Sequence, residues 1–425
     1  TTRSGIPTAQ VEITENGFSS SVTGFDGLTT ATTYDGLLRP STVTDTRDNT
    51  TTTAYYAGTT MVETVTDAAG DQSATAYDAA GRVKWNRDAR NHYTRFAYNT
   101  RGQTIQQWGD GSFPVSYGYD ATYGDKTTMS TYRGGTGFDA EDWPASPGDA
   151  DTTTWTYDEA TGVLWKKTDA PTTEHPSGKT VTTTYNSRLQ VATRTLARGV
   201  VTTYGYDSAT GELLSQTYSD DTAPVGYTYG RTGQVETVSD DTGIRDLVYD
   251  PAKPWRLTAE AEDAFYGRRV LTRLYDNDTI KGRVTGFQLG PTAGSGAELE
   301  QTFGFTTVGR FESITTKRDA NTSSRTFRYT YRTDSALIAA LTIDGNSSFG
   351  VARDYEDHRD LVTSLDTTWG ETSVSRYDYA YNELAQRTST LQSGAAFADY
   401  GDSTFHLYTY DGRGGAKPKG SCHDS

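Results

Sequence analysis

The stretch from Arg82 to Arg101 has the residue types that could bind an acidic ligand. It contains six arginines and lysines, one histidine and a single acid, in a chain whose net charge is −16. Guanidinium groups pair with carboxylates, and the interleaved aromatic side chains offer faces on which sugar rings can stack. The pattern predicts a groove for an acidic polysaccharide. The candidate binding residues are Arg82, Lys84, Trp85, Arg87, Arg90, Trp108 and Trp143.

The same stretch could also carry out polysaccharide lyase chemistry. A cation would stabilise the anion derived from a uronate carboxylate, and a tyrosine or histidine would remove a proton and protonate the leaving oxygen. The candidate catalytic residues are His92, Tyr93 and Arg95. Strand alternation places His92 on the opposite face from the other two, unless a bulge re-aims it. In the alternative interpretation, the cations only solvate an outer strand face and discourage edge pairing.

Other chemistries find little support in the sequence. The zinc-protease, Cys-x-x-Cys, serine-elbow and nucleotide-loop motifs do not occur, so no cofactor and no metal site are predicted. The acidic loop with Asp139 and Glu141 lacks the spacing of a calcium loop. The acidic net charge argues against nucleic acid as a partner, and no apolar run is long enough for a membrane span.

A repeated unit runs through almost the whole chain. Tyr77 and Tyr98 are 21 residues apart, and Gly81 and Gly102 each follow their tyrosine by four residues. An Asp or Asn after the aromatic residue can open a turn, and Gly supplies the positive φ that closes a hairpin. Sixteen such anchors recur, at Tyr34, Tyr56, Tyr77, Tyr98, Tyr119, Tyr157, Tyr185, Tyr206, Tyr229, Tyr249, Tyr275, Phe305, Tyr331, Tyr355, Tyr381 and Tyr410.

The segments TAYDAAGRV, YGYDSATGELL and YTYGRTGQVETV resemble the YD-repeat, or Rhs, family. The resemblance extends roughly from Tyr34 to Asp411 and implies long β-hairpin sheets that coil into hollow shells. Such shells enclose toxins in bacterial Rhs and insecticidal-complex proteins and form the barrel of teneurins. Toxin-type shells end in a self-cleaving DPxGL motif, which the sequence after Asp250 does not match. Neither self-cleavage nor toxicity is therefore expected of any residue here.

Composition agrees with an all-β fold of antiparallel hairpins in a curled, partly hollow sheet or barrel-like shell. Only 34% of the residues are hydrophobic, whereas 12% are aromatic. A one-layer sheet with both faces partly wet needs fewer apolar residues than a solid globule does. Sixteen hairpins imply about 32 strands and a sheet roughly 150 Å wide at ~4.8 Å per strand. A sheet of this width should curl on itself, be capped, or pair with another copy at its exposed edges.

Repeat spacing divides the chain into four parts. Residues 1–33 are expected to be N-terminal cap strands, and residues 34–249 a regular repeat sheet with an acidic insertion at 120–156. Residues 250–411 form a degenerate repeat sheet, and residues 412–425 a flexible tail. Trp143 lies in the insertion, which could fold over the first block.

Two functions remain open from the sequence. The first is an extracellular or cell-surface scaffold that encloses, displays or self-assembles through homotypic sheet-edge contacts, and that could be a fragment of a longer protein. The second is a polysaccharide lyase acting on a uronate glycan. The deciding feature is whether the basic stretch and the insertion form one cleft.

Overall fold

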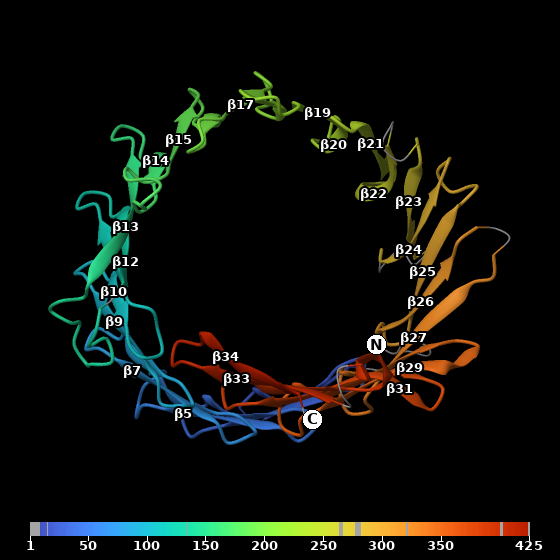
Figure 1. Ribbon diagram of the computed structural model, residues 1–425, viewed down its shortest axis with the longest axis horizontal. Helices are drawn as coiled ribbons and strands as arrows, with labels where there is room; N and C mark the ends of the chain where they lie inside the picture. Colours follow the sequence, from blue (N-terminus) through green and yellow to red (C-terminus); the bar gives the residue numbers. More distant parts are fainter. Residues whose placement is uncertain are drawn as a thin grey trace.

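The computed structural model of the protein is one antiparallel β-sheet curled into a ring around an open centre (Figure 1). It describes residues 9–14, 16–133, 135–262, 267–276, 282–319, 322–399 and 403–423. Over these residues the sheet has 34 strands, and each pairs with the next strand along the chain. The all-β prediction is confirmed, because the single helical element among these residues is the short 3₁₀ turn η1 (Ala395–Phe397).

The strands are β1 (Gln10–Ile13), β2 (Ser19–Thr23), β3 (Thr29–Tyr34), β4 (Pro40–Thr44), β5 (Thr50–Tyr55), β6 (Val62–Thr66), β7 (Gln72–Tyr77), β8 (Val83–Arg87), β9 (Tyr93–Tyr98), β10 (Thr104–Trp108), β11 (Val115–Tyr119), β12 (Lys126–Arg133), β13 (Asp149–Tyr157), β14 (Leu164–Thr168), β15 (Thr180–Tyr185), β16 (Val191–Thr195), β17 (Val201–Tyr206), β18 (Leu213–Tyr218), β19 (Val225–Tyr229), β20 (Val235–Asp240), β21 (Gly243–Asp250), β22 (Lys253–Glu262), β23 (Val270–Tyr275), β24 (Val284–Gly290), β25 (Leu299–Phe305), β26 (Phe311–Lys317), β27 (Arg325–Tyr331), β28 (Ile338–Ile343), β29 (Asn346–Tyr355), β30 (Val362–Trp369), β31 (Thr372–Tyr381), β32 (Arg387–Ser393), β33 (Ser403–Tyr410) and β34 (Ala416–His423).

The conserved geometry of each repeat begins with its turn, which follows the anchoring tyrosine. Asp78 Oδ1 accepts the backbone N–H groups of Ala80 and Arg82, both at 2.9 Å. The Gly81 N–H donates to the Asp78 carbonyl at 2.9 Å, with Gly81 at φ +80°. An aspartate therefore shapes the turn, and a residue with positive φ closes it. The turns predicted at Asn99–Gly102 and Asp207–Gly211 form the equivalent hydrogen bonds.

Hydrogen bonds link each repeat to both of its neighbours. The Tyr98 hydroxyl donates to the Val83 carbonyl of the preceding hairpin at 2.8 Å, and the Tyr206 hydroxyl makes the same contact at 2.9 Å with the Val191 carbonyl. In the forward direction, Gln103 Nε2 donates to a carbonyl of the following turn at 2.7 Å. The anchor tyrosine therefore has a structural role that explains its recurrence.

The turns fall on two rims of the sheet, because successive turns of a meander lie at opposite ends of the strands. We call the turns that follow an anchor aromatic the YD turns, as at Asp78–Arg82. The turns between repeats, as at Asp88–His92, are the inter-repeat turns. Each rim therefore carries only one kind of turn.

The sheet has little core of its own. Among the described residues, only Ala74, Trp108, Phe138 and Ala259 are buried hydrophobic residues. Most other side chains are half-exposed, as expected for one layer with solvent on both faces. Stability must therefore come mainly from ladder hydrogen bonds and cross-strand pairs. No helix in the described part of the chain is long and apolar enough to span a bilayer.

The ring makes slightly more than one turn. In Figure 1 the blue N-terminal strands run along the bottom, and the sheet passes through the left, top and right sides. The red C-terminal strands β33 and β34 return to the region of β5. The sheet is therefore an open spiral strip whose first and last parts overlap.

Two segments differ from the sequence-based expectation. Much of the acidic insertion belongs to the long paired strands β12 and β13, and only the connection between them is a loop. Within 412–425, expected to be a flexible tail, residues 416–423 form β34, which pairs with β33. At the other end, β1, β2 and β3 continue the same meander, whereas residues 1–8 lie outside the description.

Candidate functional site

The basic stretch occupies β8, β9 and the turn between them. Trp85 lies opposite Arg95, Arg87 lies opposite Tyr93, and Arg95 also lies opposite Trp108 on β10. Directly opposite residues of an antiparallel pair share a face of the sheet. Five of the predicted binding or catalytic residues are therefore neighbours on one face.

Arg95 stacks within this group of aromatic side chains. Its guanidinium carbon is 4.7 Å from the centre of the Tyr93 ring, and the Trp85 and Tyr93 rings are 5.2 Å apart in an edge-to-face arrangement. Arg95 Nη1 is buried and has no hydrogen-bond partner among the described residues. The stack holds the guanidinium by cation–π attraction, which favours a structural role and leaves one N–H group unpaired.

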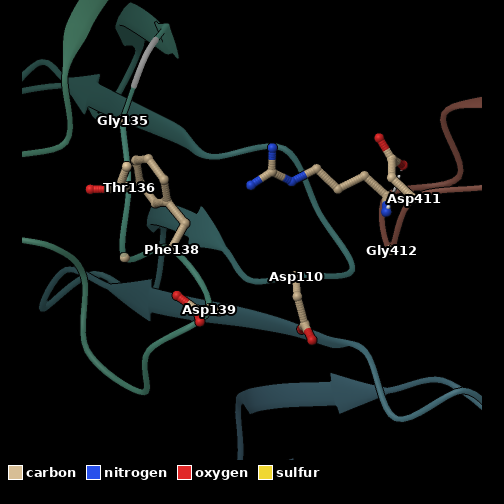
Figure 2. Close-up of a pocket in the computed structure, with 9 residues that line it drawn as sticks. Asp110, Gly135, Thr136, Phe138, Asp139, Asp411 and Gly412 are labelled. Atoms are coloured by element: carbon tan, nitrogen blue, oxygen red, sulfur yellow. Dashed lines mark hydrogen bonds between the residues drawn. The ribbon is translucent and has the colours of Figure 1, made fainter.

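His92 lies apart from this stack. It is the last residue of the Asp88–His92 turn, where its N–H donates to Asp88 Oδ1 at 2.9 Å and its Nδ1 is 3.1 Å from Asp88 Oδ2. The three candidate catalytic residues are therefore split into a turn histidine and a strand pair. Figure 2 shows the neighbouring Gly412, which packs so closely that an added Cβ would be 3.0 Å from the His92 ring.

The remaining arginines of the stretch contact protein groups. Arg82 Nε donates to Asp78 Oδ2 at 2.7 Å, which helps to lower the pKa of Asp78. Arg87 Nη2 donates to Gln72 Oε1 at 3.4 Å. Arg90 Nε is 3.9 Å from a carboxylate oxygen of Glu383, nearly 300 residues away in sequence.

The loop that joins β12 and β13 folds back onto the first block. Trp108 Nε1 donates to the Ala140 carbonyl at 3.2 Å, and the Trp108 and Trp143 rings are 5.7 Å apart. Trp143 also meets Tyr132 and Phe138, each with ring centres 5.4 Å away. The expected contact between insertion and first block is therefore present, and it forms a small aromatic core around Trp143.

One ion pair joins the basic stretch to this loop. Lys84 Nζ is 3.0 Å from Glu141 Oε1, and this hydrogen bond lowers the pKa of Glu141. Lys84 is the unpaired residue of a β-bulge, since Ala76 lies opposite Trp85 and Tyr77 opposite Val83. A bulge re-aims a side chain out of strict alternation. Within the described residues, no group of acids, histidines and cysteines could hold a metal ion.

A second cluster lies where the two ends of the strip overlap. Arg47, in the inter-repeat turn between β4 and β5, is only 5% exposed. Its guanidinium donates to the Glu356 carbonyl at 2.6 Å, the Asp357 carbonyl at 2.8 Å and the Asp360 carboxylate at 2.7 Å. One arginine therefore caps a YD turn that lies more than 300 residues further along the chain.

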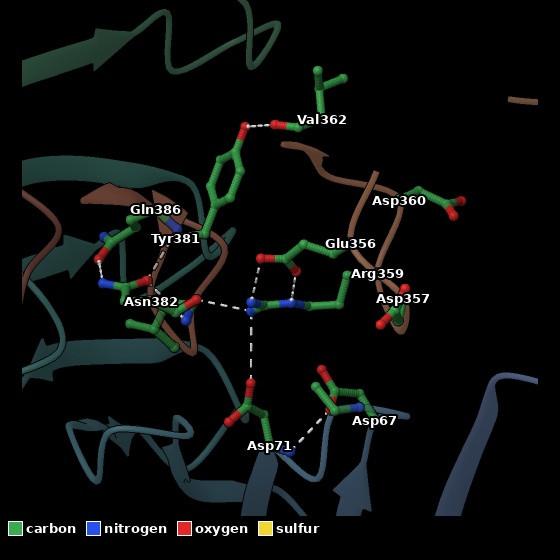
Figure 3. Close-up of polar contacts among 12 residues, drawn as sticks. Asp67, Asp71, Glu356, Asp357, Arg359, Asp360, Val362, Tyr381, Asn382 and Gln386 are labelled. Atoms are coloured by element: carbon green, nitrogen blue, oxygen red, sulfur yellow. Dashed lines mark hydrogen bonds and ion pairs between the residues drawn. The ribbon is translucent and has the colours of Figure 1, made fainter. Parts of the chain in front are cut away.

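Arg359 makes the reciprocal contact (Figure 3). Its Nε donates to Glu356 Oε2 at 2.6 Å and its Nη1 to the Asn382 carbonyl at 2.8 Å. The same Nη1 is 3.6 Å from Asp71 of the first coil. Burial raises the pKa of Asp71, the neighbouring Asp67 adds to this effect, and Arg359 opposes it.

The overlap follows a rule. In each contact, an inter-repeat turn of the first coil meets a YD turn of the last coil. Further contacts join Asp26 to Arg310 at 3.2 Å and the Phe113 ring to Arg413 at 5.5 Å. We call this interface the seam. It fastens one rim of the strip to the other.

A shallow cavity of about 280 Å³ lies at one end of the seam (Figure 2). The loop after β12, the β10–β11 connection and the last YD turn meet there. Its lining includes Asp110, Asp139, Asp411 and Arg413. Two of its carboxylates already serve the fold, because Asp110 Oδ1 accepts the Tyr93 N–H and Asp411 Oδ1 accepts turn N–H groups. The cavity is therefore a junction of the seam.

Sequence reasoning named Arg90 as a candidate ligand-binding residue, but it missed Arg47 and the role of both arginines in the seam. Arg47 and Arg90 both occupy the third position of an inter-repeat turn, which is a visible signal. Their partners could not be found from the sequence, because the offset between coils depends on the curvature of the whole sheet.

Comparison with solved structures identifies the same architecture elsewhere. The chain matches a crystal structure of TcdB2-TccC3-TEV with a TM-score of 0.62 and 14% sequence identity, over 97% of this chain and 24% of that one. It matches the Photorhabdus luminescens Tc holotoxin pore with a TM-score of 0.65 and 14% identity, over 92% and 22%. For TcdB2-TccC3 without its hypervariable C-terminal region, the TM-score is 0.63 at 14% identity, over 97% and 24%.

These matches concern the fold. They confirm the resemblance of the repeats to YD-repeat shells at the level of architecture. The chain spans about a quarter of the length of the chains that it matches. No protein-family model and no curated protein matches the sequence.

Proposed function

We propose that this chain, which has the fold of the TcdB2-TccC3 chains, is a scaffold whose curled sheet forms part of the wall of a hollow shell. The observation that carries the proposal is the seam. A YD turn of the last coil is capped by the buried Arg47 of the first coil, so the ring is held closed around its centre. A single-layer wall with so small a core is suited to enclosing space rather than to positioning catalytic groups.

Within this proposal, the shell surrounds a polypeptide and acts outside the cell. Support comes from the open centre in Figure 1 and from the fold shared with Tc toxin components. An unfolded guest, such as reduced and carboxymethylated lactalbumin carrying a fluorophore, should bind with a rise in anisotropy. The binding should be lost in Arg47→Glu, which opens the ring. Equal binding by wild type and by Arg47→Glu would show that the guest does not bind at the centre of the ring.

Small-angle X-ray scattering tests the hollow wall directly. A ring shifts the pair-distance distribution toward long distances, whereas a filled globule of the same mass gives a symmetric distribution that peaks near half its diameter. The account predicts the ring-like distribution, and a globular distribution would refute it. Arg47→Glu should broaden the distribution because the seam opens.

Acidic-glycan binding or lyase activity is the second candidate. It is favoured by the shared face of Trp85, Tyr93 and Arg95. Incubation with a panel of uronate polysaccharides, monitored by the absorbance of the unsaturated product, tests the lyase. Binding without product would indicate a glycan-binding wall that is not a lyase. If the protein shows no binding and forms no product, both the glycan-binding and the lyase interpretations are wrong.

A further inference from the structure

Three inter-repeat turns share one geometry and one arginine position. In Asp45–Asn49, Asp88–His92 and the turn from Leu196 to Val200, the first N–H donates to the fifth carbonyl and the fourth N–H to the first carbonyl. The fourth residue has positive φ in all three turns, at 62°, 65° and 89°. The third residue is Arg47, Arg90 or Arg198.

These turns also lie on the same rim. They follow β4, β8 and β16, and in a meander every second turn lies at the same end of the strands. Arg47 and Arg90 are covered by the last coil, whereas the last coil does not reach Arg198. The third arginine is accordingly 67% exposed, with one long ion pair of 3.7 Å to Asp220.

The contacts of Arg47 show what such an arginine recognises. Two of its three partners are the backbone carbonyls of the first two residues of a YD turn, Glu356 and Asp357. A guanidinium fork binds such closely spaced acceptors well. Arginines of a preceding repeat bind the same carbonyls in other YD turns, as Arg82 binds the Asn99 carbonyl at 3.2 Å and Arg188 binds the Ser208 carbonyl. Recognition therefore depends mainly on turn geometry, so YD turns other than Glu356–Asp360 can be bound.

We propose that the turn carrying Arg198 is an unfilled latch at which a second copy of this chain docks one of its uncovered YD turns. Uncovered YD turns are available on the first and middle parts of the strip. The YD turn that opens at Asp158 also carries the exposed Glu159, whose carboxylate complements a cation. The contact would be continuous with the rim that the chain already uses for its own seam.

The contact is heterologous, because an inter-repeat rim meets a YD rim. A head-to-tail contact forms a closed ring only if the rotation between copies closes, and otherwise association continues with rising concentration. Charged contacts dominate the seam, so added salt should weaken the association.

Sedimentation velocity over a range of protein concentrations at low salt tests the proposal. Wild type should show a sedimentation coefficient that rises with concentration, and Arg198→Glu should weaken this association roughly tenfold or more. Arg198→Lys should give an intermediate result, because an ammonium lacks the planar fork. Arg133→Glu is the matched control, since Arg133 is 74% exposed and pairs with Asp151 on a strand.

Two results would overturn the proposal: wild type that remains monomeric at every concentration, or Arg198→Glu that associates as wild type does. Unchanged far-ultraviolet circular dichroism would show that each variant is folded. The proposal builds on the seam that supports the proposed shell. Cross-linking across the chain's own seam distinguishes failure of the proposed shell from failure of the proposed association between copies. It reports ring closure in the monomer whether or not copies associate.

Discussion

At the scale of residues, an anchor tyrosine and the Asp or Asn that follows it account for most of the local order in the repeats that contain them. The tyrosine hydroxyl reaches back to a carbonyl of the preceding hairpin, and the aspartate shapes the turn that follows. Both roles are met again in the last repeat, where the Tyr410 hydroxyl donates to the Arg387 carbonyl at 2.7 Å and Asp411 caps its turn. The recurring Tyr-Asp pair therefore links adjacent hairpins through the tyrosine hydroxyl and shapes the turn through the aspartate.

Removing one tyrosine hydroxyl should weaken the link between two hairpins and lower the free energy of unfolding measurably. Tyr98→Phe deletes the donor to the Val83 carbonyl and leaves a half-buried acceptor unpaired. The expected loss is about 0.5–1.5 kcal/mol of unfolding free energy, measured by urea denaturation. Tyr123→Phe is the control, because Tyr123 is largely exposed. Equal effects of the two substitutions would contradict the proposed role.

The turn aspartates should make the protein sensitive to acid. Hydrogen bonds from Arg39 and Arg82 lower the pKa of Asp35 and Asp78 from the ordinary 3.8. A group with a lowered pKa stabilises the fold above its unfolded pKa, and that contribution is lost as the pH falls through the folded value. Asp71 has a raised pKa and works in the opposite direction.

The melting temperature should therefore be nearly constant from pH 8 to about pH 5 and fall below about pH 4. Differential scanning calorimetry in matched ionic strength measures it. Asp78→Asn retains an acceptor for the turn N–H groups and should flatten the acid decline slightly. A melting temperature that rises below pH 4 would show that the turn carboxylates do not govern acid stability.

At the scale of elements, the sequence predicts the regular hairpins well. It predicts poorly the strands that lie where the repeat spacing is irregular. A turn needs only a few adjacent residues, so the period of Tyr77 and Tyr98 is sufficient to place it. The repeat spacing jumps to 38 residues between Tyr119 and Tyr157, so the sequence does not predict the paired strands β12 and β13. Alternation also placed Tyr93 and Arg95 on one face of their strand, but the pairing of Arg95 with Trp85 depends on the strand register. The sequence could not show that Arg95 stacks on Tyr93.

Arg95→Ala should distinguish a structural stack from a glycan site. The half-buried guanidinium contacts Tyr93, so its removal should cost about 0.5–2 kcal/mol of stability. Lys84→Ala is the matched control, because Lys84 is exposed and pairs only with an exposed Glu141. Arg95→Ala that leaves stability unchanged but weakens binding to a uronate polymer would favour the glycan interpretation.

The loop over the first block should be held by its tryptophan. Trp143→Ala removes ring contacts to Trp108, Tyr132 and Phe138. The Trp108 ring should then be more exposed to solvent. The emission of the remaining tryptophans should shift to the red, with a loss of about 2–4 kcal/mol of stability. Trp369→Ala, at an exposed position, should produce neither change. Unchanged emission in Trp143→Ala would mean that the loop does not cover Trp108.

At the scale of the whole molecule, curvature decides what the residues meet. The sequence predicts a wide sheet that must curl, and it predicts neither the overlap nor the partners across it. Arg47 and Asp360 are 313 positions apart, and no local pattern relates them. Their contact exists because the strip completes one turn and is displaced by the height of one strand. The proposed scaffold therefore requires the ring, and the ring requires the contacts of the seam.

Cross-linking across the seam tests this central claim most directly. In a Cys422→Ser background, Ala69→Cys and Asp357→Cys place one exposed thiol on each of two turns that Arg359 joins through Asp71. A short bismaleimide should link them within the monomer, detected as one linked peptide pair by mass spectrometry. Ala69→Cys with Ala209→Cys should not link, because these residues precede β7 and follow β17, which lie at the lower left and at the top of the ring in Figure 1. Efficient linking of 69 to 357 alone is the predicted result, whereas linking of neither pair, or of both equally, would contradict a closed ring.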